Sequence, residues 1–389
     1  MSYKHGIYTE SVNTIGRLST REFGTVPVYI GTSPSGTANV PVLISSYNDF
    51  VSKFGYDDDW DANTLCEVAY AHFKNPIHTI APIICIKIAT ADKTNVEAAL
   101  AAIDKAPIKC GIAPNIIVVP KYSHTYITEI LAKCTNLIGG KWGCVAYIDI
   151  PTDTVDTIAE ALEYKSTNKI ASKLLRLHYP KAIYGGKVFH LSVLDAVASQ
   201  VVDNESDGVS CHSSSNQRIM CDVPVIDEET EILYSEAEAN SLNEKGITTI
   251  NHIGGSFRLW GGHMANYDHA TIDSIEAKDR SDATVRMQIY LDNWLKREFV
   301  DHIDRPLTRR DIDNIISNVN IALNSFVNSG YLLKGECYFD DGENVTAELA
   351  DGNLVLDVLH TEVPNGKSIS FKLQYDLSGL NALYATEEV

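Results

Sequence analysis

Strand-like apolar runs alternate with amphipathic helical segments in the first half of the chain, and this pattern constrains the fold more than any other feature. The apolar runs are IICIKIA at 83–89, NIIVVP at 115–120 and CVAYIDI at 144–150. Helical spacing of apolar residues is found at 96–103, at 126–137 and from Val155 onward. Strands that are apolar throughout are typical of a mostly parallel sheet covered on both faces. The sequence therefore predicts a mixed, largely parallel α/β body.

Two further strand-like runs precede this alternation. VPVYIG at 26–31 and VPVLISS at 40–46 flank a turn-forming Ser-Pro-Ser-Gly. A helix is expected next, with Leu65 and Phe73 on its apolar face, and Pro76 should end it because the residue before a proline avoids helical geometry. About twenty residues at the N-terminus carry too few large apolar side chains for a core. We expect them to form an arm that pairs elsewhere.

Two long helices and a β region are predicted for the C-terminal third. Met287, Leu291, Leu295 and Phe299 recur every four residues and indicate the first helix. The second should begin at a capping box of Thr308 and Asp311 and end at Gly330. Strands are expected at 331–339, 354–360 and 368–377. In the last of these, polar residues alternate strictly with Ile369, Phe371, Leu373, Tyr375 and Leu377.

An acidic stretch suggests where the chain divides. Residues 222–244 contain eight Asp and Glu and no Lys or Arg, which is typical of an exposed connection between units. We therefore expect a boundary near residue 245. The predicted organisation is an N-terminal arm at 1–24, an α/β body at 25–245, a C-terminal domain of two long helices on a small β-sheet at 246–376, and a tail at 377–389.

Charge and cysteine content narrow the partners and the compartment. The formal net charge of −19 argues against nucleic acid or an anionic membrane as the main partner, because such surfaces repel an acidic protein. Plain solubility and a specific basic partner both remain open. The eight scattered cysteines form no C-x-x-C pair and favour free thiols in a reducing cytoplasm. The N-terminus lacks the apolar core of a secretory signal, and no run is long enough to insert in a bilayer.

Motifs for catalysis, cofactors and metals are weak throughout. Residues 31–36 (GTSPSG) resemble a phosphate-binding turn but lack the following Lys-Ser/Thr. The acidic run at 57–61 fits a helix-capping turn better than a calcium loop. His252, His263 and His269 match no zinc spacing. We assign no catalytic, cofactor-binding or metal-binding residue and expect the protein not to be an enzyme.

The segment LNEKGITTINHIGGSFRLWGG at 242–262 resembles the signature of the contractile tail sheath family, in which a G-I-x-T-I motif precedes a glycine-rich stretch and L-W-G. Residues 31–55 resemble the family's N-terminal pattern of a glycine turn, a P-V-L-I strand and a D-F-x-x-x-F-G helix end. Residues 291–335 resemble its paired C-terminal helices and following strand. The resemblance extends from about residue 25 to residue 375.

This resemblance implies a structural subunit of a phage tail or R-type bacteriocin. Such subunits assemble as six-fold rings stacked helically around an inner tube, and contraction drives that tube through a cell envelope. The implied partners are other copies of the chain, the inner tail tube protein, and the baseplate and tail terminator proteins, with no nucleic acid and no membrane insertion. Assembly would take place in the bacterial cytoplasm, and the 246–376 domain would lie near the tube. A rival interpretation is a soluble α/β enzyme or small-molecule binding protein, and another is a capsid or other tail component.

The same resemblance implies that strands at the chain ends link neighbouring subunits. The residues expected in these links are Ile7, Tyr8, Val12, Ile15, Ile369, Phe371, Leu373, Tyr375 and Leu377. A basic cluster at the junction of the two C-terminal helices is unusual in so acidic a chain, and it consists of Lys296, Arg297, Arg305, Arg309 and Arg310. We hypothesise that this cluster faces an acidic tube surface; pairing with acidic residues of the same chain is the alternative.

Overall fold

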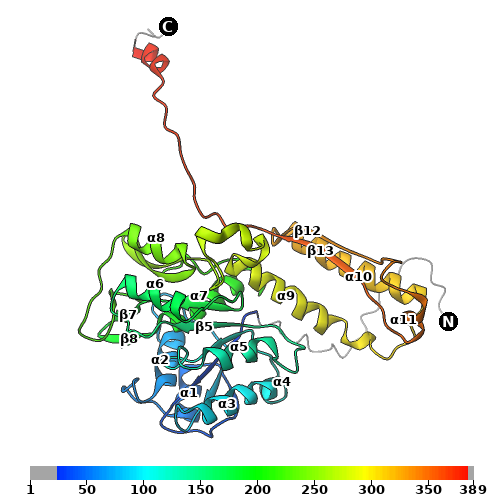
Figure 1. The fold of residues 1–389 in the computed structure, drawn as a ribbon, viewed down its shortest axis with the longest axis horizontal. Helices are drawn as coiled ribbons and strands as arrows, with labels where there is room; N and C mark the ends of the chain where they lie inside the picture. The colour runs from blue at the N-terminus through cyan, green and yellow to red at the C-terminus, as the bar shows by residue number, and fades with distance from the viewer. Residues whose placement is uncertain (1–23, 384–389) are drawn as a thin grey trace, which may run out of the picture.

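A computed structural model of the protein describes residues 24–383, and its centre is an eight-stranded sheet (Figure 1). The strand order is β11-β10-β6-β5-β4-β1-β3-β2. The strands are β1 (Pro27–Gly31), β2 (Pro41–Ile44), β3 (Ile83–Lys87), β4 (Ile116–Val118), β5 (Val145–Asp149), β6 (Leu175–His178), β10 (Ile247–Ile253) and β11 (Ser256–Trp260). Neighbours from β10 to β3 are parallel, and the two edge strands β2 and β11 pair antiparallel. The predicted mixed, largely parallel α/β body is confirmed.

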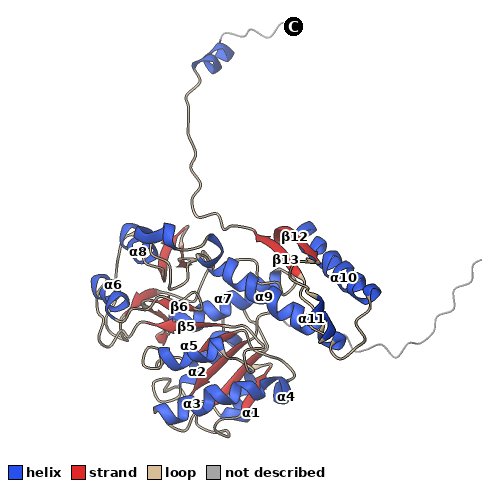
Figure 2. Cartoon of the chain, turned by 45° about the vertical axis from the view of Figure 1, so that its right-hand side comes forward, coloured by secondary structure: helices blue, strands red, loops and turns tan. Residues whose placement is uncertain are grey.

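Helices cover both faces of this sheet (Figure 2). Alternate residues of β1 enter opposite cores, with Val28 and Ile30 on one side and Tyr29 on the other. The Val28 side is covered by α3 (Lys93–Ala102), α5 (Ile127–Thr135), α6 (Ile158–Thr167) and α8 (Glu236–Glu244). The Tyr29 side is covered by α1 (Tyr47–Phe54), α2 (Thr64–Phe73) and α7 (Leu191–Glu205). This two-sided burial explains why the central strands are apolar along their whole length.

Shorter elements complete the body. A three-stranded antiparallel sheet has the order β8-β7-β9. Its strands are β7 (Lys181–Tyr184), β8 (Lys187–Phe189) and β9 (Val223–Val225). The remaining short helices are α4 (Ala106–Cys110), η1 (Ile103–Lys105), η2 (His269–Ser274) and η3 (Ala277–Asp279). All eight cysteines are free and six are buried, as expected from their scattered positions. No helix within residues 24–383 is long and apolar enough to cross a membrane.

The acidic stretch 222–244 is not simply an exposed connection, so that part of the prediction is wrong. It contains β9 and the helix α8, which begins at a capping box of Ser235 and Glu238. Ala239 and Leu242 of α8 are buried against the body, while the acidic side chains face solvent. β10 and β11 follow in the main sheet, which therefore extends past residue 245. The chain leaves the sheet after β11, at Trp260, and reaches α9 at Asp282. The division into domains stays a prediction.

The C-terminal unit consists of two long helices, α9 (Asp282–Glu298) and α10 (Arg309–Asn328), and the hairpin of β12 (Leu332–Tyr338) and β13 (Asp357–Glu362). The helices are joined through η4 (Val300–His302), and the hairpin strands through α11 (Thr346–Ala350). Thr308 and Asp311 form the predicted capping box of α10. The shared core includes Met287, Leu291, Val319, Leu323, Leu332 and Cys337. α9 carries the unit away from the sheet (Figure 1).

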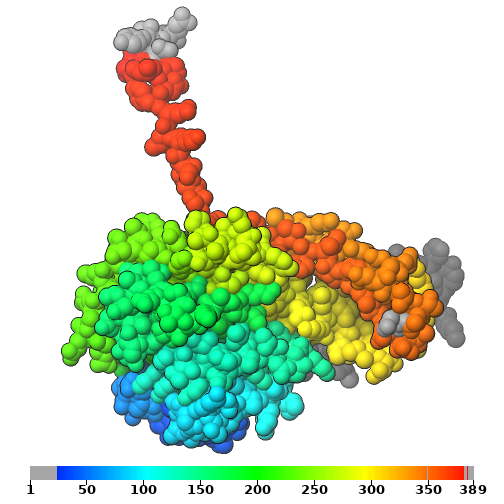
Figure 3. Space-filling model, in the orientation of Figure 1, coloured from blue at the N-terminus to red at the C-terminus, as the bar shows by residue number. Residues whose placement is uncertain are grey.

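The predicted strand at 368–377 is absent from the structure. This stretch has no assigned secondary structure up to Asp376 and runs away from the body to the short helix η5 (Leu377–Leu383), as the red stalk in Figure 3 shows. A strand needs a partner to satisfy its backbone, and this segment meets none within the described chain. Ile7, Tyr8, Val12 and Ile15 lie outside the described residues.

Candidate assembly interface

The projecting segment, residues 368–377, exposes a regular set of large apolar side chains. Phe371 is 85% exposed and Leu373 is 97% exposed, and Ile369, Tyr375 and Leu377 are also mostly exposed. Lys372 and Gln374 alternate with them. In a β-strand alternate side chains share one side, so pairing with another strand would gather these apolar groups into a single stripe. Stripes of this size are uncommon on the surface of a soluble monomer and mark interaction sites.

One edge of the β12–β13 hairpin is closed by a side chain. Asn320 of α10 donates from Nδ2 to the carbonyl of Cys337 at 2.8 Å and accepts from the Cys337 N–H at 2.7 Å. The backbone of Cys337 therefore points away from β13 and toward α10. Asn320 thus occupies the outer edge of β12 at this point.

The opposite edge of the hairpin, along β13, is open. Cys337 pairs with Val358, and both members of an antiparallel pair of this kind turn their N–H and C=O groups outward. Val358, and His360 two residues on, therefore present backbone groups along the outer edge of β13. Among the described residues, no backbone hydrogen bond from 357–362 goes anywhere except to β12. Unpaired strand edges are templates for another strand.

All five residues of the predicted basic cluster lie exposed around the corner between α9 and α10. Three of them pair within their own helix or with the adjacent residue: Lys296 with Asp292 at 2.7 Å, Arg297 with Glu298 at 3.3 Å and Arg309 with Asp313 at 3.1 Å. These pairs are exposed and hence weak. Val300 and Ile303 are exposed at the same corner. The structure thus leaves all five basic residues exposed at this corner, together with two apolar side chains that the sequence analysis had not singled out.

A buried ionic network, which the sequence analysis missed, fastens α9 to the body. Arg176 of β6 lies 2.7 Å from Asp282, at the first turn of α9, and 3.0 Å from Asp195 of α7. Burial alone would raise the pKa of Asp195, but Arg176 and the His178 ring at 2.7 Å outweigh burial and lower it to about 2. Asp195 therefore stays charged. The sequence signal was a pair of polar residues, Arg176 and His178, alternating with leucines in a strand that is buried along its whole length.

The residues considered for metals or phosphates serve local structure. In the 31–36 turn, Ser33 donates to the carbonyl of Ser35 at 2.9 Å, and Ser35 donates to the Phe54 carbonyl at 2.8 Å. Asp58, in the acidic run, pairs with Lys187 at 2.6 Å. The ring of His263 stacks on Tyr267 at 3.6 Å. Within residues 24–383, no three His, Cys, Asp or Glu side chains form a group that could hold a metal ion.

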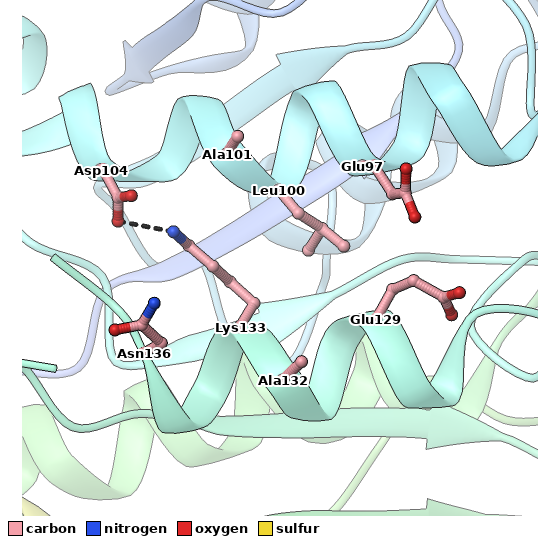
Figure 4. Close-up of a pocket in the computed structure, with 8 residues that line it drawn as sticks. All are labelled: Glu97, Leu100, Ala101, Asp104, Glu129, Ala132, Lys133 and Asn136. Carbon is pink, nitrogen blue, oxygen red and sulfur yellow. Dashed lines mark hydrogen bonds and ion pairs between the residues drawn. The ribbon is translucent and has the colours of Figure 1, made fainter. Parts of the chain in front are cut away.

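A surface hollow of about 300 Å³ lies between α3 and α5 (Figure 4). Lys133 spans it to Asp104 at 2.6 Å, and Asp104 also accepts from the Ile138 N–H at 2.8 Å. Glu129, at its other end, pairs with Lys93 at 2.6 Å. The charged groups of the hollow are thus paired across the two helices. We interpret them as supports for helix packing.

Several curated proteins resemble this chain in sequence. No family model matches the chain. It is 25% identical over 313 residues to the tail sheath protein of Burkholderia phage BcepMu, a match that covers 73% of this chain and 63% of that protein. It is 26% identical over 267 residues to the major tail sheath protein of Serratia phage KSP20, covering 66% of this chain and 62% of that protein. Both matches span less than two thirds of these relatives. The match to the tail sheath protein of Escherichia phage P2 covers 95% of each chain at 21% identity.

Chains of solved contractile assemblies share the fold of this chain. A chain of the anti-feeding prophage baseplate superimposes with a TM-score of 0.70 at 15% identity, covering 97% of this chain and 100% of that one. A chain of the PVC sheath complex of an extracellular contractile injection system, in its contracted state, gives 0.68 at 15% identity, with 97% and 99% covered. These relatives are named as structural proteins, which confirms the prediction of a protein that is not an enzyme. The chain is thus similar in sequence to tail sheath proteins of phages and of a prophage, and it shares its fold with chains of contractile injection systems.

Proposed function

We propose that the chain is the structural subunit of a contractile tail sheath. In this proposal, copies assemble as six-fold rings stacked around an inner tube, and the array contracts to drive the tube through a cell envelope. The observation that carries the proposal is the apolar stripe of the projecting segment, which lacks a partner within the described chain. The similarity to sheath proteins supports it.

Strand donation between copies follows from two complementary surfaces. The projecting segment offers an extended backbone with alternating side chains, and the β13 edge offers unpaired backbone groups at Val358 and His360. Adding the segment of one copy to the β13 edge of another supplies backbone hydrogen bonds to both and covers the apolar stripe. The alternation fixes the register, because a slip by one residue would turn Phe371 and Leu373 back into water.

Contraction would then be a change of packing between tethered bodies. The donated strands hold copies together while their α/β bodies slide into a shorter and wider array. Two packings that differ by only a few kcal/mol per subunit, as in other bistable assemblies, release a large total when many copies convert. No nucleotide or other fuel is required, since the energy is stored in the extended array during assembly.

The basic cluster is our proposed contact with the inner tube. In this proposal the five cations, three of which pair with Asp292, Glu298 and Asp313 in the free chain, exchange these carboxylates for acidic groups of the tube, which also guides docking. Exposed pairs such as Arg309 with Asp313 are weak enough to exchange partners when the sheath moves.

The baseplate and the tail terminator protein would bind the two ends of the sheath. The working location is the assembled tail particle, built in the cytoplasm of the bacterial host.

Negative-stain microscopy of the purified full chain tests this function. We expect concentration-dependent rings or tubes, and we expect Phe371→Ser with Leu373→Ser to reduce tube formation at least tenfold without lowering the unfolding temperature. Lys372→Ser with Gln374→Ser is the matched control on the polar side of the same segment and should still form tubes. A chain that stays monomeric at every concentration, or apolar variants that assemble normally, would contradict the proposal.

A further inference from the structure

Both terminal segments are anchored within the first two turns of the same helix, α9. On the C-terminal side, the Asn365 side chain donates to the Ser281 hydroxyl at 2.9 Å. Ser281 is the residue that precedes α9, and its hydroxyl makes no capping bond to the helix. On the N-terminal side, Arg286 of α9 donates to the Thr25 hydroxyl at 3.3 Å. The two anchors are therefore separated by little more than one helical turn.

The N-terminal anchor is deeply buried. Thr25 donates to Asp203 of α7, and Asp203 forms an ion pair with Arg286. The Asn115 side chain accepts from the Val26 N–H at 3.0 Å and donates to the Thr25 hydroxyl at 3.1 Å. The chain entering this anchor is in close backbone contact with the body, because a Cβ atom on Gly24 would lie 2.6 Å from the Cα of Gly208. Pulling Thr25 and Val26 out would break their bonds to Asn115 and remove one hydrogen bond from the Asp203 carboxylate, which would keep Arg286 as its partner. Hydrogen bonds lost at a buried site are costly because water cannot replace them.

The C-terminal anchor is exposed and consists of a few side-chain contacts. Besides the contact of Asn365, Lys367 donates to the Tyr267 hydroxyl at 3.2 Å and lies over the Tyr267 ring at 5.4 Å. Asn365 and Lys367 are both exposed. Water can replace both contacts when they break, so they resist separation only weakly.

The helix between the anchors is itself fixed to the sheet. Asp282, at the start of α9, forms the buried pair with Arg176 of β6 described above. Arg176 also donates to the carbonyl of Gly261, the residue directly after β11, at 2.8 Å. The first turn of α9 is thus a rigid point on the body, with one firm and one weak attachment beside it.

We propose that the first two turns of α9 transmit tension between the two terminal segments, with a fixed N-terminal anchor at Thr25 and a hinge at residues 363–367 on the C-terminal side. This rests on the proposed sheath function, because it assumes that both segments are held by neighbouring copies. During contraction, the projecting segment turns about its anchor while residues 24–26 keep their contacts. Arg286 and Asp203 act as positioning residues that hold the fixed end.

Paired disulfides in full-length chain, assembled into tails, test the asymmetry. Ser281→Cys with Asn365→Cys would lock the hinge, and Thr25→Cys with Ser210→Cys would lock the fixed anchor, where the two hydroxyls lie 3.3 Å apart. Each variant is compared oxidised and reduced, with bond formation verified by mass spectrometry because the chain holds eight native thiols. We expect the oxidised hinge lock to lower the contracted fraction at least tenfold and reduction to restore it. Forming the 25–210 bond should leave the contracted fraction equal to that of the reduced form of the same variant, which also lacks the Thr25 and Ser210 hydroxyls. The inference would be overturned if tails with the 281–365 bond contracted normally. It would also be overturned if the 25–210 bond blocked contraction as well.

Two further measurements do not depend on the engineered bonds. Asn365→Ala with Lys367→Ala changes only exposed side chains and should make tails contract at a lower urea concentration, with no change in the unfolding temperature of the free chain. Hydrogen exchange on the free chain should be at least a hundredfold slower at the amides of 25–28 than at those of 365–368. Equal exchange rates would reject the asymmetry even if the chain formed perfect sheaths, whereas failure of the unmodified chain to form sheaths would reject the proposed function instead.

Discussion

The side-chain amide of Asn320 is bonded to both backbone groups of Cys337, as a neighbouring strand would be. We predict that Asn320→Ala lowers the free energy of unfolding of the C-terminal unit by about 2 kcal/mol, because the buried N–H and C=O of Cys337 lose their partner. Chemical denaturation and hydrogen exchange at residue 337 would measure this. Asn324→Ala, at an exposed position on the same helix, is the control and should change stability by less than about 0.5 kcal/mol.

A pair of glycine substitutions separates backbone strain from steric overlap. Gly246 and Gly254 both have positive φ, at 66° and 61°. A Cβ atom on Gly246 would lie 2.5 Å from the Met264 carbonyl oxygen, whereas a Cβ atom on Gly254 would meet nothing within 4 Å. Gly254→Ala should therefore cost about 1 kcal/mol from the φ angle alone. Gly246→Ala should cost roughly 1–3 kcal/mol more, because the backbone must move. Equal losses in urea denaturation would contradict this explanation.

Charge reversal at the corner between α9 and α10 tests the tube contact. Arg309→Glu with Arg310→Glu should leave self-assembly of the sheath intact and reduce the number of sheathed tubes at least tenfold, since the proposed acidic partner would then be repelled. Lys105→Glu with Lys109→Glu makes the same change in net charge at exposed positions of the α/β body and should have no such effect. The proposed contact would be rejected by normal tail assembly in the first variant.

Buried His72 predicts a loss of stability in mild acid. Burial lowers the pKa of His72 to about 3, and its ring lies 2.6 Å from the Tyr29 hydroxyl. Below pH 6.5 the unfolded chain binds a proton at this histidine while the folded chain does not, so stability falls as the pH drops from 6.5 toward 3. The contribution of His72 amounts to about 2 kcal/mol at pH 5.

Urea denaturation at pH 7 and pH 5 measures this effect. His72→Gln cannot be protonated and should weaken the pH dependence by that amount, whereas His212→Gln, at an exposed site, is the control. Some dependence will remain in both variants, because burial also lowers the pKa of His263, to about 4. An unchanged pH dependence in His72→Gln would show that this histidine is not the source.

Local signals in the sequence were sufficient for much of the fold. The capping box of Thr308 and Asp311 joins residues three apart, and the apolar runs of β3, β4 and β5 require only burial on both faces, so both features can be predicted without knowledge of the tertiary structure. The acidic residues of 222–244 misled us because charge reports exposure of side chains and not the absence of structure. Ala239 and Leu242 of α8 are buried and hold this helix against the body despite the acidic residues around them.

Long-range relationships could not be predicted. Arg176 and Asp282 are 106 residues apart, and nothing in either local segment identifies the other as its partner. Alternation at 368–377 predicts which side chains would share a side in a strand, but a strand needs a partner that this chain does not supply among its described residues. The closure of the β12 edge by Asn320 likewise depends on how α10 packs on the hairpin, which no sequence period encodes.

The projecting segment and the β13 edge are different surfaces of one molecule, and this has a consequence for symmetry. Unless two copies exchange their segments reciprocally, a pairing of these unlike surfaces is not two-fold symmetric and leaves one free donor and one free acceptor. Growth by this contact has a direction and ends only when a ring closes or when another protein occupies the last free surface. A particle of defined length built from such a chain therefore needs a separate start and a separate stop.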